Sequence, residues 1–81
     1  MSNTETGSGD LVKSLLKGLA VIEAFDGEDP AMTLSEVAKK TGFTRAGARR
    51  LLLTLVSAGY ASQDGSYFSL TPRVPKLGYA Y

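Results

Sequence analysis

The chain has 81 residues, which is enough for one small domain of ordinary globular composition. It contains no cysteine and no histidine, which excludes disulfides, thiolate or imidazole metal sites, and nucleophile or base catalysis by these side chains. No segment is apolar for long enough to span a bilayer, and no secretory signal is present. We therefore expect a cytoplasmic protein with no enzymatic activity, no cofactor, no metal and no membrane partner.

The formal net charge of +1 conceals an uneven distribution. Residues 1–38 carry two basic and seven acidic side chains, whereas residues 39–81 carry seven basic and one acidic, so the net charges of the two parts are −5 and +6. A basic half suits a surface that binds a polyanion. The distribution by itself equally fits a solvated surface that is merely asymmetric.

Residues 1–10 are polar and rich in Gly and Ser, so we expect a disordered tail. A first helix is predicted to follow an N-cap at Asp10 and to end near Asp26, where the segment D-G-E-D-P begins. The carboxylates of that segment lack the ligand spacing of a calcium loop, which favours a solvated turn over a cation site. The predicted helix has an apolar stripe of Leu11, Val12, Leu15, Leu19 and Ile22, with Leu16 and Phe25 at its edges and Lys13, Lys17 and Ala24 opposite.

A second helix is predicted from the capping box T-x-x-E, in which the Thr33 hydroxyl accepts the Glu36 N–H and the Glu36 carboxylate accepts the Thr33 N–H. Met32 and Val37 occupy the two hydrophobic staple positions. Gly42 is expected to end the helix as its C′ residue. The predicted buried face consists of Leu34, Val37 and Ala38, with Lys39 and Lys40 exposed.

A third helix is predicted from Arg45 to about Ala58, with Thr44 as its N-cap and Gly59 as its C′ residue. The very short connection holds it at a steep angle to the preceding helix. Its predicted buried face is Ala48, Leu51, Leu52, Leu55 and Val56, and its outward residues are Ala46, Arg49, Arg50, Leu53, Thr54 and Ser57.

A hairpin is predicted from Tyr60 to Leu70, with Asp64-Gly65 as its turn. Such a small hairpin must pack against the helices, and Ala31 and Met32 can supply a third short strand.

Two proline dipeptides, Thr71-Pro72 and Val74-Pro75, then favour extended backbone, so any last helix is expected to start at or beyond Pro75. The chain stops within a new apolar pattern of Leu77, Tyr79 and Tyr81, and we expect it to be part of a longer protein.

The span from Thr33 to Tyr60 combines a capping box, a glycine turn, a second N-cap and matching apolar faces, which is the pattern of a helix-turn-helix. In such a unit the second helix lies in the DNA major groove and the first crosses the backbone. Arg45 and Arg49 are the first candidates for base contacts, because a guanidinium can bind guanine O6 and N7 together, whereas Arg50 suits a base or a phosphate. An isolated arginine more often serves only solubility, but three on one outer face favour DNA.

Other side chains complete the candidate interface. Ala46 and Gly47 keep the helix start slim, and Thr44 and the free amides near Ser35 can anchor phosphates. Leu53 suits a thymine methyl or a neighbouring segment, Tyr67 suits a phosphate or the core, and the uncharged hairpin tip either meets DNA through amides and hydroxyls or stays clear. The complete set of predicted DNA-contacting residues is Ser35, Thr44, Arg45, Ala46, Gly47, Arg49, Arg50, Thr54, Ser66 and Tyr67.

From Leu11 to Tyr81 the chain resembles the winged helix-turn-helix domain of the isocitrate lyase regulator (IclR) family. The most specific segments are T-L-S-E-V-A-K-K-T-G and T-R-A-G-A-R-R-L-L-L-T-L-V-S-A-G-Y. The run T-R-A-G-A-R-R is similar to the subgroup that controls aromatic-acid catabolism through the β-ketoadipate pathway. Pro75 departs from the bulky apolar residue that is usual at its position.

The resemblance implies a mainly α fold with a small β-hairpin, in which a three-helix core and a wing occupy residues 11–71. Residues 72–81 would begin a linker to a C-terminal effector-binding domain that is missing from this chain. The implied protein is a bacterial transcriptional regulator that binds double-stranded DNA as a homodimer or tetramer, assembled through helix one and the linker, and responds to a small molecule through the missing domain. The alternative from another class is a winged-helix module for protein association.

Overall fold

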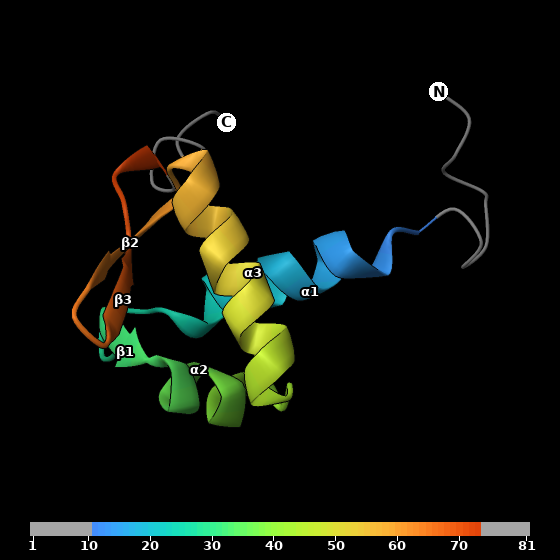
Figure 1. The fold of residues 1–81 in the computed structure, drawn as a ribbon, viewed down its shortest axis with the longest axis horizontal. Helices are drawn as coiled ribbons and strands as arrows, with labels where there is room; N and C mark the ends of the chain where they lie inside the picture. The colour runs from blue at the N-terminus through green and yellow to red at the C-terminus, as the bar shows by residue number, and fades with distance from the viewer. Residues whose placement is uncertain (1–10, 74–81) are drawn as a thin grey trace.

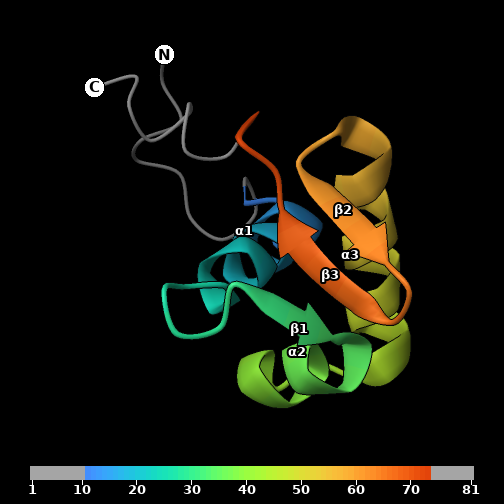
Figure 2. The same cartoon turned by 90° about the vertical axis from the view of Figure 1, so that its left-hand side faces the viewer.

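The computed structural model describes residues 11–73, so the predictions for residues 1–10 and 74–81 lie outside the described part. A three-stranded antiparallel sheet, in the order β1-β3-β2, lies on one side of three helices (Figures 1 and 2). This arrangement confirms the winged helix-turn-helix fold. None of the described helices has the length and apolarity needed to cross a membrane. The elements in chain order are α1 (Lys13–Ala24), β1 (Ala31–Thr33), α2 (Leu34–Thr41), α3 (Arg45–Ala58), β2 (Ala61–Asp64) and β3 (Tyr67–Leu70).

Helix α1 begins later than predicted and ends near Asp26, as predicted. Its N-cap is Val12, which is extended at φ −96° and ψ 106° and provides no side-chain cap, so the predicted N-cap at Asp10 is wrong. At the other end Phe25 is the C-cap, with extended backbone and a buried side chain, one residue before Asp26. Asp26 stabilises the turn that follows α1, because its Oδ1 accepts the N–H groups of Glu28 and Asp29 at 2.9 Å each.

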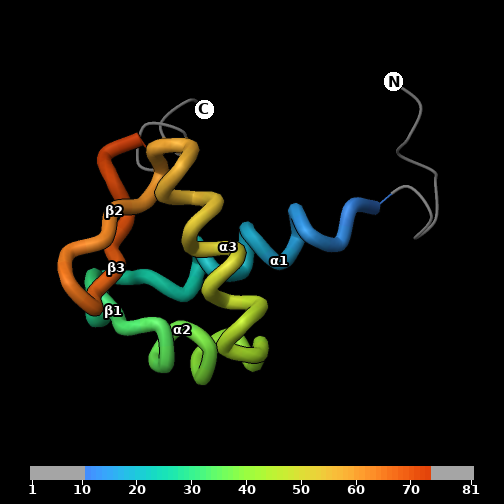
Figure 3. Tube along the Cα trace, viewed as in Figure 1, coloured from blue at the N-terminus to red at the C-terminus, as the bar shows by residue number. Residues whose placement is uncertain are grey.

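The face that α1 packs against the core also differs from the predicted stripe. Val21 and Ala24 are buried, although the helical pattern places Ala24 on the opposite side. The C-terminal part of α1 packs on the other helices, whereas its N-terminal part projects past them (Figures 1 and 3). As a result, several apolar residues of the predicted stripe and its edge are 46–61% exposed, namely Leu11, Val12, Leu15, Leu16 and Leu19.

Lys40 ties the acidic loop after α1 to α2. Its Nζ lies 3.1 Å from Oδ2 of Asp26 and 3.1 Å from Oδ2 of Asp29. The Asp29 N–H and the Lys40 ammonium hold the pKa of Asp26 below its usual value, and the hydrogen bond to Asp26 raises the pKa of Lys40. The cation that neutralises these carboxylates is therefore a lysine of the chain itself, and within residues 11–73 no group of ligands forms a metal site.

The caps of the helix-turn-helix are those that the sequence predicts. Thr33 Oγ1 accepts the Glu36 N–H at 3.2 Å, and Glu36 Oε1 accepts the Thr33 N–H at 2.8 Å. Gly42 ends α2 in the left-handed conformation at φ 81°, a region that favours glycine. Thr44 Oγ1 accepts the Gly47 N–H at 3.0 Å and starts α3, so both helix boundaries at the turn are fixed by local bonds.

The predicted end of α3 and the third strand are confirmed, but the hairpin turn is shifted by one residue. Gly59 closes α3 at φ 90°, and β1 pairs with β3 from Ala31 opposite Ser69 to Thr33 opposite Tyr67. Asp64 pairs with Tyr67, so the two-residue turn is Gly65-Ser66 and not Asp64-Gly65. Gly65 has φ 63°, and none of the described non-glycine residues, Ser66 included, has a positive φ, which is the pattern of a type II′ turn.

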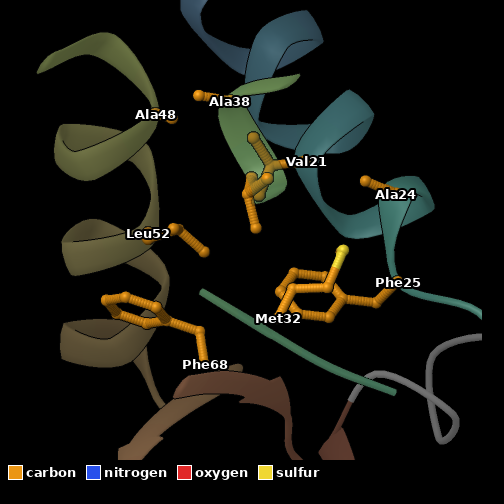
Figure 4. Close-up of a cluster of buried hydrophobic side chains, with 9 residues drawn as sticks. Val21, Ala24, Phe25, Met32, Ala38, Ala48, Leu52 and Phe68 are labelled. Atoms are coloured by element: carbon orange, nitrogen blue, oxygen red, sulfur yellow. The ribbon is translucent and has the colours of Figure 1, made fainter. Parts of the chain in front are cut away.

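Side chains from all three helices and from β1 and β3 meet in one core (Figure 4). Leu52 and Val37 are fully buried, and Phe68 packs beside them from the wing. Both staple positions, Met32 and Val37, lie in this core, whereas Leu34 is half-buried at its edge. The core therefore fixes α2, α3 and the sheet to one another.

The chain leaves the wing against the end of α3. Thr71 donates its hydroxyl to the Gly59 carbonyl at 2.6 Å and its N–H to the Tyr60 carbonyl at 3.0 Å. Arg73 has helical backbone, and the expectation that a last helix starts at or beyond Pro75 concerns residues outside the described part. Thr71 Oγ1 accepts the Arg73 N–H at 3.3 Å, with Pro72 between them.

Candidate nucleic-acid interface

One stripe of α3 faces an open groove beside the wing. Arg45, Arg49 and Leu53 recur at four-residue spacing, so they lie on one side of the helix. They line a groove of about 290 Å³ together with Ser35 of α2 and Ser66 of the wing. The structure therefore brings together four predicted contact residues, Ser35, Arg45, Arg49 and Ser66, from three elements.

Ser35 and Arg45 touch each other directly. The Arg45 Nη1 donates a hydrogen bond to Ser35 Oγ, although the two residues are ten positions apart. The contact forms because α3 packs against α2 and the long Arg45 side chain reaches back to Ser35. Sequence reasoning assigned the two side chains separate roles, one at a base and one at a phosphate.

Arg50 and Thr54 lie on the other flank of α3. With Gly47 they line a second, mainly apolar groove of about 730 Å³ that runs between α1 and α3. Lys13 and Lys17 of α1 line the same groove. The Thr54 hydroxyl donates to the Arg50 carbonyl at 2.8 Å, so its proton is already used within the helix.

Two of the predicted residues at the start of α3 have structural tasks. The Thr44 hydroxyl oxygen accepts the Gly47 N–H, and a Cβ added to Gly47 would lie 3.1 Å from that oxygen. The small size of Gly47 thus leaves room for the cap, whereas Ala46 is exposed.

The wing presents polar side chains and no cation at its tip. Ser66 lines the groove beside α3, and Gln63 Nε2 donates to the Gly65 carbonyl at 3.1 Å. Tyr67 is 51% exposed, because its neighbour Phe68 points into the core and adjacent strand residues face opposite ways. The core alternative for Tyr67 is therefore excluded.

Sequence reasoning missed part of the groove wall. The strand register places Gln63 opposite the buried Phe68, and both residues line the groove with Thr33 and Leu34. Strand alternation could have predicted that Gln63 lies on the same face of the sheet as Phe68. The predicted turn was wrong by one residue, and this error changed the residue expected opposite Phe68.

No described carboxylate compensates the positive charge of the α3 arginines. Within residues 11–73 the ion pairs are those of Lys40 with Asp26 and Asp29, and no carboxylate lies within 4.0 Å of Arg45, Arg49 or Arg50. Positive charge without an internal partner, on an exposed helix beside a groove, is suited to an anionic polymer.

Comparison with known proteins identifies the family of this domain. Residues 14–65 match the family profile described as the IclR helix-turn-helix domain. The Pca regulon regulatory protein of Pseudomonas putida is 45% identical over 76 residues, which are 94% of this chain and 26% of that protein. The crystal structure of a transcriptional regulator from Rhodococcus sp. RHA1 is similar with a TM-score of 0.83 and 59% identity, over 88% of this chain and 28% of that chain. An IclR family transcriptional regulator from Brucella abortus is similar with a TM-score of 0.84 and 32% identity, over 99% of this chain and 32% of that chain. This chain therefore spans between a quarter and a third of these relatives, and it belongs to the IclR family of transcriptional regulators, whose helix-turn-helix DNA-binding domain it contains.

Proposed function

We propose that the domain binds double-stranded DNA sequence-specifically by placing α3 in the major groove, with Arg49 at base edges. The observation that carries this proposal is the open groove in which the α3 stripe of Arg45 and Arg49 faces the wing and α2, with no carboxylate of residues 11–73 paired to either arginine. An α-helix is about 10–12 Å wide and fits the major groove, which is about 12 Å wide. Both flanks of α3 therefore come close to DNA when its outer side faces the bases.

The remaining candidates are assigned to the DNA backbone. Arg50 shares its groove with Lys13 and Lys17, and three cations on one flank suit the phosphates of one groove wall. On the other flank, the exposed Ser66 and Tyr67 suit the opposite strand through hydroxyl groups, since the wing tip has no cation.

We also propose that the intact regulator is a homodimer or a tetramer that assembles partly through α1. The support is the row of exposed apolar residues on α1, because apolar side chains gathered on one projecting helix commonly mark an association surface. A dimer would present two copies of α3 to half-sites about one helical turn apart, or a multiple of that spacing.

We propose that the regulated genes encode enzymes of aromatic-acid catabolism. The relative from Pseudomonas putida is a Pca regulon regulatory protein, and the run T-R-A-G-A-R-R resembles the same subgroup. The effector would bind outside this chain, in the part of the relatives that the chain does not cover.

We assign the regulator to the cytoplasm, where bacterial DNA lies, and no catalytic role to this domain. The assignment of no catalytic role is supported by the absence of histidine and cysteine from the sequence and by the membership of this domain in a family of regulators.

A titration of labelled mixed-sequence duplex at increasing salt tests the proposal against a protein-association module. For a DNA-binding domain the logarithm of affinity falls steeply and linearly with the logarithm of salt, with a slope of about −0.9 per neutralised phosphate. Absence of binding at low salt, at chain concentrations that support dimerisation, would refute DNA binding and favour the protein-association module.

A further inference from the structure

The starts of α2 and α3 are joined on their outer side by one side-chain contact. Arg45 is the first residue of α3 and Ser35 the second residue of α2, and Arg45 donates a hydrogen bond to Ser35 Oγ. Both side chains are exposed, and both line the groove beside the wing. The contact therefore lies on the side of the molecule that is proposed to face DNA.

The hydrogen bond leaves the Arg45 guanidinium able to bind an anion. Within residues 11–73 no carboxylate pairs with it, and the Glu36 carboxylate at the start of α2 accepts the Thr33 N–H. A guanidinium has five N–H donors in one plane. One bond to Ser35 thus fixes the orientation of the group while most of its donors remain free.

This position favours a phosphate over a base for Arg45. In a helix-turn-helix the first helix crosses the DNA backbone, and the hydrogen bond holds the guanidinium on the flank of α3 next to that helix. A free arginine samples many rotamers, and ordering it on binding costs conformational entropy. A hydroxyl that selects the rotamer in advance reduces this cost.

We propose that Ser35 is a positioning residue that acts through Arg45. Its hydroxyl places the guanidinium against a DNA phosphate, which leaves Arg49 as the arginine that reads bases. The proposal rests on the proposed function, because it requires α3 to lie in the major groove. It replaces two sequence-based expectations, a base contact by Arg45 and an independent phosphate contact by Ser35.

A double-mutant cycle on the full 81-residue chain tests this proposal. Affinity for a duplex selected from a random pool and for mixed-sequence duplex is measured by fluorescence anisotropy for the wild type, Ser35→Ala, Arg45→Ala and the double variant. Ser35→Ala is expected to weaken binding to both duplexes about three- to tenfold, the effect of one hydrogen bond. In the Arg45→Ala background the same change is expected to have no further effect.

Two further measurements separate positioning from a general structural role. Ser35→Thr keeps the hydroxyl and is expected to recover most of the affinity, and Arg45→Ala is expected to reduce the salt slope by about 0.9 without altering base preference. Ser62→Ala is the matched control, because it removes a hydroxyl that lies 3.3 Å from Ser69 Oγ in the wing. Ser62 is adjacent to Gln63, so its side chain faces the side of the sheet away from the groove. The DNA affinity of Ser62→Ala is therefore expected to equal that of the wild type.

Several outcomes would overturn the proposal. An equal loss for Ser35→Ala with and without Arg45 would mean that Ser35 meets DNA by itself, and no loss in either background would remove any role for the contact. A base preference that relaxes in Arg45→Ala would make Arg45 a base reader. If the wild-type chain binds no duplex at all, the proposed function itself fails, a result distinct from binding without coupling.

Discussion

Replacing Gly42 by alanine tests whether the turn between α2 and α3 depends on backbone conformation alone. Gly42 has φ 81° and ψ 6°, and a Cβ added there meets no atom within 4 Å. The substitution therefore creates no clash, and its N–H can still bond the Ala38 carbonyl, 2.9 Å away. What remains is the cost of a left-handed conformation for a residue with a Cβ, about 1–2 kcal/mol.

For a domain of this size such a loss lowers the midpoint of thermal unfolding by roughly 4–8 °C per kcal/mol. Circular dichroism during heating measures it, and Gly42→Asn should lose less, because asparagine tolerates the left-handed region. Gly18→Ala is the matched control, since a Cβ at this α1 position also meets no atom within 4 Å and its φ is not positive. That control should gain stability by up to about 1 kcal/mol. Equal stability of Gly42→Ala and wild type would show that the left-handed conformation at position 42 does not require glycine.

Three other predictions follow from the described contacts. Because the pKa of Asp26 is lowered in the folded state, its stabilising contribution is complete above its ordinary pKa of about 3.9 and is lost as the pH falls below it. Urea unfolding between pH 2 and 5 should therefore depend on pH less steeply for Asp26→Asn than for wild type, and equal slopes would contradict this. Replacing single thymines of a selected site by deoxyuridine removes their methyl groups and should weaken wild-type binding at one position by about 0.8 kcal/mol. The same replacement should leave the binding of Leu53→Ala unaffected. An equal loss in both proteins would exclude Leu53 as the residue that contacts the methyl group. Leu15→Glu on the exposed face of α1 should leave the unfolding free energy within about 0.5 kcal/mol of wild type while shifting sedimentation from dimer to monomer, and an unchanged dimer would exclude this face.

The helix-turn-helix could be predicted from the sequence because its boundaries depend on local chemistry. The Thr33 and Thr44 caps and the left-handed glycines Gly42 and Gly59 form bonds within a few residues of themselves. Such signals do not depend on how distant parts of the chain pack. Their positions and residue types were therefore readable in advance.

The packing of α1 could not be predicted in the same way. Helical periodicity identifies an apolar stripe, but it does not say what covers it, and the stripe around Leu15 is exposed while Val21 and Ala24 enter the core. The contact between Ser35 and Arg45 depends on the angle between two helices. The hairpin turn moved by one residue because pairing of the buried Phe68 with Gln63, and not the Asp-Gly signal, sets the register.

The central claim is that α3 reads bases through Arg49. Selection of bound duplexes from a random pool, carried out with wild type and with Arg49→Ala, tests it most directly. For wild type an enriched site with two related half-sites is expected. For Arg49→Ala we expect the loss of preference at one position in each half-site, worth about 1–3 kcal/mol, with the other positions retained. No enriched sequence for wild type, or uniformly weaker binding by Arg49→Ala with the same preferences, would contradict it.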